Sequence, residues 1–144
     1  MLTRNFLKIF PLCFALIALV LFVADAKTIL VDESDDSSHI CMYTGDILTI
    51  RLVSNPTTGY SWTNTDSPSN LELLSSKSTP GQADTAGAPG YQTYSFKATK
   101  PDQSTLILNY IRPFEKNTPP AKRFRLSITV EERPAFLQAS SAKP

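Results

Sequence analysis

Period-two alternation of apolar and polar residues limits the fold of this chain more than any other feature. The alternation recurs in four segments rich in β-branched and aromatic residues: Asp46–Val53, Tyr91–Ala98, Ser104–Ile111 and Lys122–Glu131. It is typical of strands that bury one face. Shorter strand candidates are Thr28–Val31, Ile40–Tyr43, Tyr60–Asn64 and Leu71–Ser76. Seven or eight short strands separated by turn residues predict an all-β fold, an immunoglobulin-like antiparallel β-sandwich.

The N-terminal residues have the pattern of a secretory signal. Arg4 and Lys8 precede the apolar stretch Leu12–Val23, and Ala24–Ala26 forms a small-x-small cleavage site. The stretch is too short to span a bilayer comfortably, so an uncleaved anchor is the weaker alternative. We expect a signal peptide at 1–26, a β-sandwich domain at 27–133 and a flexible tail at 134–144. The protein should enter the secretory pathway, to be secreted or held in a lysosome-like or vesicular compartment.

Charge excludes two classes of partner. Losing Arg4, Lys8 and Asp25 with the signal reduces the 14 basic and 13 acidic residues to 12 of each. A chain with a net charge near zero lacks the basic patch that binds nucleic acid, and it gives no reason to expect a membrane partner after cleavage. The one basic cluster, Lys122–Arg125, alternates with Phe124 as the solvated face of a strand would.

The residues that could carry catalysis or bind metal are few. After signal cleavage Cys41 is the only cysteine, and we expect it to be a buried small hydrophobe. His39, Cys41 and Met42 would be a poor metal site, because there is neither a second histidine nor a carboxylate beside them. No nucleophile motif surrounds any serine. We therefore expect no enzyme, no metal and no cofactor, and a monomeric protein.

Three unusual connections should lie at one end of the sandwich. Successive strands reverse direction, so the connections 54–59, 77–90 and 112–121 emerge together, and the plainer turns emerge at the other end. In the first, Pro56 fixes φ and Gly59 permits a positive φ, so the loop should be stiff. The third places Arg112 beside Phe114, a pairing enriched at interface hot spots. Each motif alone is typical of an ordinary turn, and their joint placement favours a binding face.

The three motifs resemble those of the chagasin family of cysteine-peptidase inhibitors. The resemblance extends from about Thr28 to Glu132. Asn55, Pro56, Thr57, Thr58, Gly59 and Tyr60 match the family's N-P-T-T-G-aromatic loop. Gly87, Ala88, Pro89 and Gly90 match its G-x-G-G loop in part, with Pro89 in place of a glycine. Arg112, Pro113 and Phe114 match its R-P-W motif, with phenylalanine in place of tryptophan.

The resemblance implies a reversible, tight-binding inhibitor of papain-like cysteine peptidases of the cathepsin L or B type. Thr57 and Thr58 would lie nearest the enzyme's catalytic Cys–His pair. Gly87–Gly90 would flank the cleft on one side, and Arg112 and Phe114 would pack on the other. The alternative is a secreted immunoglobulin-like recognition or adhesion module that uses the same loops on a different protein partner.

Overall fold

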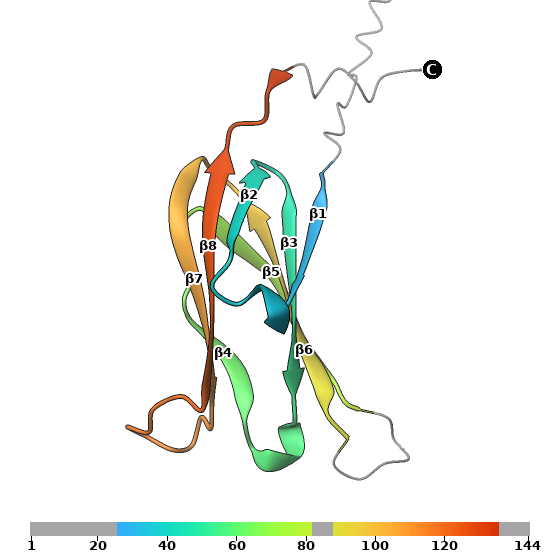
Figure 1. The fold of residues 1–144 in the computed structure, drawn as a ribbon, viewed down its shortest axis with the longest axis vertical. Coiled ribbons are helices and arrows are strands. Elements are labelled where there is room, and N and C mark those ends of the chain that lie inside the picture. The colour runs from blue at the N-terminus through green and yellow to red at the C-terminus, as the bar shows by residue number, and fades with distance from the viewer. Residues whose placement is uncertain (1–25, 82–87, 136–144) are drawn as a thin grey trace, which may run out of the picture.

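The computed structural model describes residues 26–81 and 88–135. Within them the chain forms two four-stranded sheets packed face to face (Figure 1). The strands are β1 (Thr28–Asp32), β2 (His39–Tyr43), β3 (Ile47–Ser54), β4 (Ser61–Asp66), β5 (Leu71–Thr79), β6 (Gly90–Ala98), β7 (Asp102–Ile111) and β8 (Lys122–Glu131). Two 3₁₀ turns, η1 (Glu33–Asp35) and η2 (Pro56–Thr58), interrupt the connections. The predicted immunoglobulin-like β-sandwich is confirmed.

The strand order is β1-β3-β6-β5 in one sheet and β2-β8-β7-β4 in the other. All pairs are antiparallel except β1 with β3 and β2 with β8, which are parallel. The predicted antiparallel pairing is confirmed for the other four strand pairs of the described residues, and these two edge pairs differ from it. The reason is that successive strands reverse direction, so β1 runs in the same direction as β3, and β2 in the same direction as β8.

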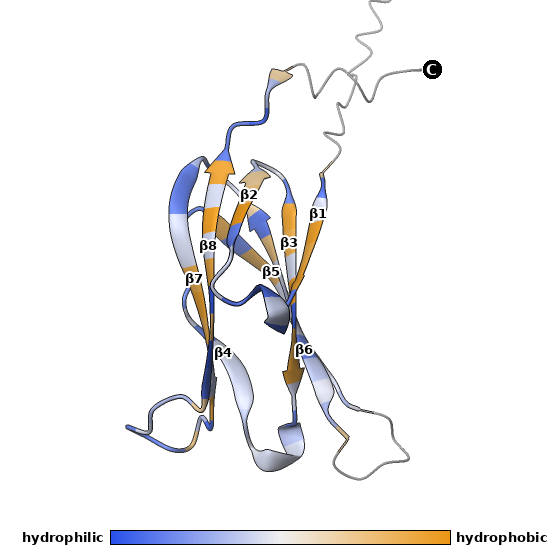
Figure 2. Cartoon of the chain, viewed as in Figure 1, coloured by the Kyte–Doolittle hydropathy of each residue, from blue (hydrophilic) through white to orange (hydrophobic). Residues whose placement is uncertain are grey.

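Alternation places the core where the sequence predicts it. Leu48, Ile50 and Leu52 of β3 are fully buried, as are Leu106 and Leu108 of β7. Figure 2 shows apolar residues concentrated along the middle of the strands, while the connections are polar. This continuous core gives the loops a rigid base.

The acidic connection Asp32–Ser38 is an ordered turn that contains η1. Asp32 Oδ1 accepts hydrogen bonds from the Ser34 hydroxyl at 2.6 Å and from the Ser34 N–H at 2.8 Å, which caps η1. These two bonds hold the pKa of Asp32 below its usual range. Ser37 donates from its N–H to the Arg125 carbonyl at 2.7 Å. The turn thereby carries the chain from the first sheet to the second.

The three unusual connections emerge together, as strand parity predicts. Figure 1 shows the β3–β4 and β7–β8 connections, together with the end of β5 and the start of β6, at its lower end, and the β2–β3, β4–β5 and β6–β7 turns at its upper end. We call the lower group the loop end. In the described part of the chain, no helix is long and apolar enough to cross a membrane.

Candidate peptidase-binding site

The β3–β4 loop is a short 3₁₀ turn with a cap at each end. The Asn55 side chain accepts hydrogen bonds from the Thr57 N–H at 3.3 Å and the Thr57 hydroxyl at 2.6 Å. Gly59 ends the turn in the left-handed region, with φ 76°, and donates its N–H to the Pro56 carbonyl at 3.1 Å. Proline at the start and a left-handed glycine at the end make the loop rigid.

The tip of this loop presents no charge. Pro56, Thr57 and Thr58 are all exposed. The Thr58 hydroxyl donates to the Asn55 carbonyl at 2.6 Å, so the protons of both threonine hydroxyls are used within the loop. The tip therefore offers methyl groups and backbone to a partner, and docking it orders few additional side chains.

Arg112, which follows β7, ties the β7–β8 loop to the β3–β4 loop. Its Nε donates to the Thr58 carbonyl at 3.2 Å, and its Nη1 pairs with Glu115 at 2.8 Å. Its guanidinium lies 4.4 Å from the centroid of the Tyr60 ring. The hydrogen bond to Glu115 raises the pKa of Arg112, so this side chain stays charged. The two loops form one unit rather than two independent arms.

Phe114 projects from that unit. Its side chain is 70% exposed, which makes it the most exposed of the large aromatic residues in the described ranges. One edge of its ring packs over Gly59, where a Cβ atom would lie 3.1 Å from Phe114 Cε1 and 3.2 Å from Cζ. The absence of a side chain at Gly59 thus makes room for the ring beside the loop tip.

Aromatic rings beneath the loops connect them to the core. The Tyr110 ring lies 5.2 Å from the Tyr60 ring and 5.0 Å from the Trp62 ring, centroid to centroid. The Tyr110 hydroxyl accepts a hydrogen bond from the Asn55 N–H at 3.0 Å, and Trp62 Nε1 donates to the Val53 carbonyl at 2.9 Å. The sequence motifs did not identify Tyr110 as a residue whose hydroxyl supports the loop.

The β5–β6 connection is described only at its base. Residues 82–87 lie outside the described residues, and so does the predicted contact residue Gly87. Pro89 is exposed and Ala88 is half-buried. Gly90 is buried, pairs with Ser54 of β3, and leaves no room for a Cβ atom, which would overlap the Thr79 carbonyl oxygen. Its place in the fold is to let two strands approach closely.

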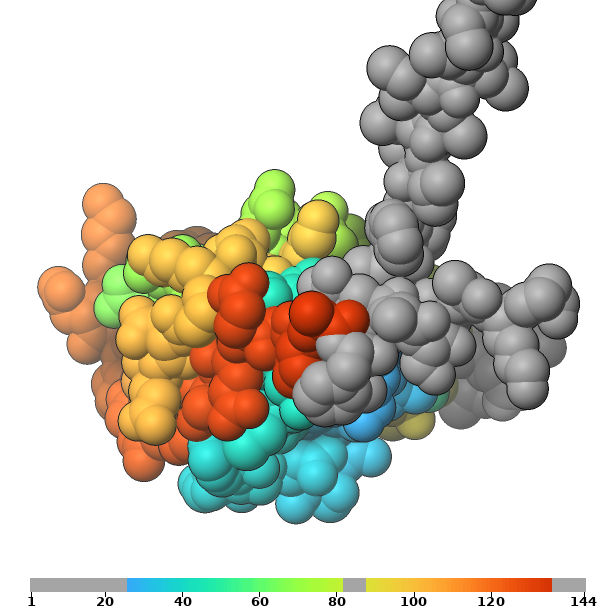
Figure 3. Space-filling model, turned by 90° about the horizontal axis from the view of Figure 1, so that it is seen from above, coloured from blue at the N-terminus to red at the C-terminus, as the bar shows by residue number. Residues whose placement is uncertain are grey.

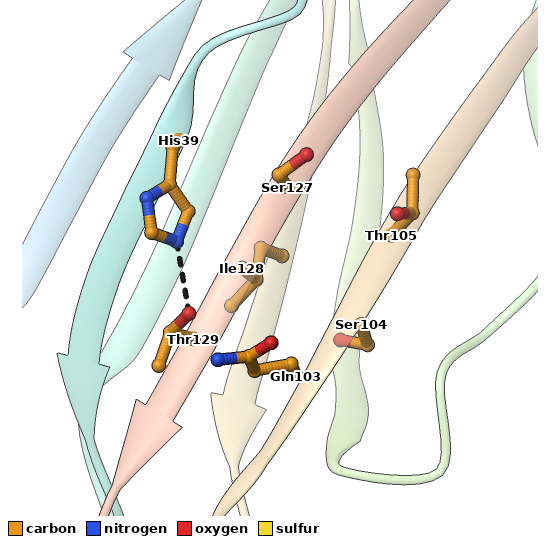
Figure 4. A pocket seen from close by; sticks show the side chains of 7 residues that line it. All are labelled: His39, Gln103, Ser104, Thr105, Ser127, Ile128 and Thr129. Atoms are coloured by element: carbon orange, nitrogen blue, oxygen red, sulfur yellow. Dashed lines mark hydrogen bonds between the residues drawn. The ribbon is translucent and has the colours of Figure 1, made fainter.

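The residues considered for a metal site do not converge. Cys41 is exposed, which contradicts the prediction that it is buried; alternation along β2 turns Met42 inward instead. His39 Nε2 lies 2.8 Å from the Thr129 hydroxyl, over a shallow polar surface hollow (Figure 4). No group of three or more His, Cys, Asp or Glu side chains able to hold a metal occurs in the described ranges.

Comparison with known proteins gives the family. The sequence profile of the chagasin family peptidase inhibitors matches residues 41–128, a span that contains all three loops. The chain belongs to the chagasin family. Its members are peptidase inhibitors and not enzymes.

Individual relatives agree with the profile. The chain is 29% identical over 104 residues to Amoebiasin-2 of Entamoeba histolytica, covering 70% of this chain and 84% of the relative. It is similar to the crystal structure of the cysteine protease inhibitor EhICP2 from Entamoeba histolytica, with 25% identity and a TM-score of 0.66 over 74% of this chain and 98% of the other. It is also similar to Leishmania mexicana ICP, with 31% identity and a TM-score of 0.51 over 74% and 90%.

Proposed function

We propose that this protein is a reversible, tight-binding inhibitor of papain-like cysteine peptidases that inserts its loop end into the active-site cleft. The observation that carries the proposal is the rigid, uncharged β3–β4 loop, flanked by the exposed Phe114, at one end of a chagasin-family fold. The relative EhICP2 is a cysteine protease inhibitor. The same activity is proposed for this chain.

In this proposal the loop tip blocks the cleft without being cleaved. A peptidase acts on backbone that it can hold in an extended conformation, whereas Pro56–Thr58 is a 3₁₀ turn closed by a left-handed glycine. Leaving that conformation would break the capping bonds of Asn55. Thr57 and Thr58 would face the catalytic groups of the enzyme and resist hydrolysis for this reason.

The neighbouring residues divide into contact and support. Phe114 would pack against one wall of the cleft as an aromatic anchor, and Ala88 and Pro89 would lie on the other side. Arg112 already bonds to Thr58 and Glu115, so we propose that it positions the β3–β4 loop rather than contacting the enzyme. This differs from the expectation that Arg112 packs directly on the enzyme.

An inhibition titration tests the proposal. The protein is added to a cathepsin-L-like peptidase at fixed substrate, and the residual rate is measured against inhibitor concentration. We expect competitive inhibition with a Ki in the nanomolar range, together with intact inhibitor after prolonged incubation. Full activity of several papain-like enzymes at micromolar protein would refute the function.

A capture experiment separates inhibition from the alternative of a recognition module. The peptidase is presented to the immobilised protein with its cleft open or filled by a bulky covalent ligand. An inhibitor captures only the open enzyme, because the ligand occupies the space of the loops. Equal capture of both forms would favour a module that recognises another surface.

The location of the protein is proposed from its N-terminal sequence. We infer that residues 1–26 are removed as a secretory signal and that the protein is secreted or delivered to a lysosome-like or vesicular compartment. Residues 1–25 lie outside the described part of the chain. Mass spectrometry of the protein purified from culture medium should give an N-terminus at Lys27. A chain that stays in the cell with residues 1–26 attached would contradict this.

A further inference from the structure

A buried carboxylate lies at the end of the sandwich opposite the loops. Asp46, in the turn between β2 and β3, is 1% exposed. Its Oδ2 accepts a hydrogen bond from the Tyr43 N–H at 2.9 Å, and its Oδ1 forms an ion pair with Arg133 Nη2. Oδ1 also accepts the N–H of Lys27 at 3.0 Å. Three segments distant in sequence thus meet on one side chain.

Lys27 is the residue that directly follows the proposed cleavage site. We propose that removal of residues 1–26 turns the Lys27 nitrogen into an N-terminal ammonium group that binds Asp46, so that processing locks this end of the domain. The inference rests on the proposed cleavage after Ala26. Hydrolysis adds water across the Ala26–Lys27 bond, leaving a carboxylate on Ala26 and on Lys27 an amine, which takes up a proton at neutral pH.

The backbone of Lys27 is held in place independently of its own N–H group. Its carbonyl accepts a hydrogen bond from the Ile47 N–H at 2.9 Å, and β1 then continues beside β3 with Thr28 opposite Ile47. The nitrogen therefore stays within bonding distance of Asp46 when its chemistry changes. An ammonium donor makes a shorter and stronger bond to a carboxylate than an amide does.

The charged and titratable groups around this nitrogen favour its protonated form. Asp46 Oδ1 lies 3.0 Å from the nitrogen and also pairs with Arg133 Nη2, whose like charge opposes protonation in part. The Tyr43 ring lies 5.7 Å from the Arg133 guanidinium. Lys97 of β6, which pairs with Ile47, is exposed, so solvent screens its charge. Because the opposite charge is the nearest one, the pKa of the amine should exceed its ordinary value of about 7.7–8.0.

The contact joins the segments before β1 and after β8 to the β2–β3 turn. Figure 3 looks at this end and shows residues after β8 (red) beside those of β2 and β3 (cyan). Arg133 Nε also donates to the Thr44 carbonyl at 3.4 Å. The ammonium group would fix the start of edge strand β1 to the same cluster, which opposes fraying of that strand.

Thermal unfolding of two matched chains tests the inference. One chain begins at Lys27, as processing would leave it, and the other retains Ala26, which moves the charged amine one residue away from Asp46. At about pH 6 the Lys27 chain should melt about 3–5 °C higher. Since its amine has a raised pKa, this advantage should be complete below pH 7.7 and disappear as the pH rises through the raised pKa.

Asp46→Asn in both chains supplies the control. It should abolish the difference between them, because the amide side chain carries no charge. If the variant does not fold, the amine pKa is measured directly in the Lys27 chain by NMR after reductive ¹³C-methylation. Equal melting temperatures across the pH range, or an amine pKa at or below about 8, would overturn the proposal. No peptidase is involved, so failure here leaves the inhibitory function untouched, and the reverse holds as well.

Discussion

Replacing Gly59 by alanine should weaken inhibition, because this glycine supports both the β3–β4 loop and Phe114. Gly59 has φ 76° and ψ 1°, which an alanine adopts only with strain. A Cβ atom would also lie 3.1 Å from Phe114 Cε1, so the ring must move by a few tenths of an ångström. The substitution therefore perturbs the loop tip and the aromatic anchor together.

The magnitude follows from the two contributions. Holding alanine in the left-handed region costs roughly 1–2 kcal/mol, and Phe114, being largely exposed, can shift at little further cost in stability. The strain that the free loop retains lowers the free energy of unfolding. The strain that it avoids by changing shape is lost on binding instead. We expect the exposed loop to relax, so that Ki rises by up to about 5–30-fold while stability falls by less than about 1–2 kcal/mol.

Gly45→Ala is the matched control. Gly45 also has a positive φ, 90°, but it lies in the β2–β3 turn at the other end, and a Cβ atom there would meet nothing within 4 Å. It should lower the melting temperature comparably and leave Ki unchanged. Both variants are measured by thermal unfolding and by inhibition titration against one papain-like peptidase. An unchanged Ki for Gly59→Ala, or equal losses for the two variants, would refute the assignment of the loop.

Three other residues, two beside the loop and one in the core, give further predictions. Tyr110→Phe removes the hydroxyl that accepts the Asn55 N–H, so the free energy of unfolding should fall by about 1 kcal/mol in denaturant titrations and Ki should rise several-fold. Phe114→Ala should raise Ki about tenfold or more without lowering the melting temperature. Phe114→Trp should strengthen binding by about 1 kcal/mol, which lowers Ki about fivefold. Burial raises the pKa of Tyr94, so its contribution to stability is present below pH 10.0 and is lost as the pH rises through the raised pKa; Tyr94→Phe should reduce the alkaline slope of stability.

Alternation predicted the strands because a strand that buries one face has an apolar residue at every second position. The inward residues of β3, β6, β7 and β8 are those the pattern selects. It failed at Cys41, where a five-residue edge strand is too short for residue type alone to decide which face is inward. The parallel pairing of β1 with β3 and of β2 with β8 has no local signal in the sequence either. Which strands pair depends on contacts between segments that are not neighbours in the sequence.

The sequence identified the loop residues, but it did not show which of them hold the loop in place and which are exposed for binding. Proline and glycine mark the stiff turn at Pro56 and Gly59 in the sequence itself. Nothing local indicates that the Arg112 guanidinium turns back to the Thr58 carbonyl, or that Tyr110 bonds Asn55 from 55 residues away. Such contacts depend on how two loops meet, and only the assembled sandwich defines that geometry.

Thr58→Arg tests the central claim most directly. The side chain is exposed at the loop tip, so a long cation there should collide with the cleft while the fold is retained. Thr99→Arg, at an exposed threonine in the β6–β7 turn of the opposite end, is the control. Inhibition titrations should show a Ki raised at least about a hundredfold for Thr58→Arg and unchanged for Thr99→Arg. Thr58→Arg loses the exposed bond of its hydroxyl to Asn55, so its melting temperature should fall only slightly. Undiminished inhibition by Thr58→Arg would contradict the placement of this loop in the active-site cleft.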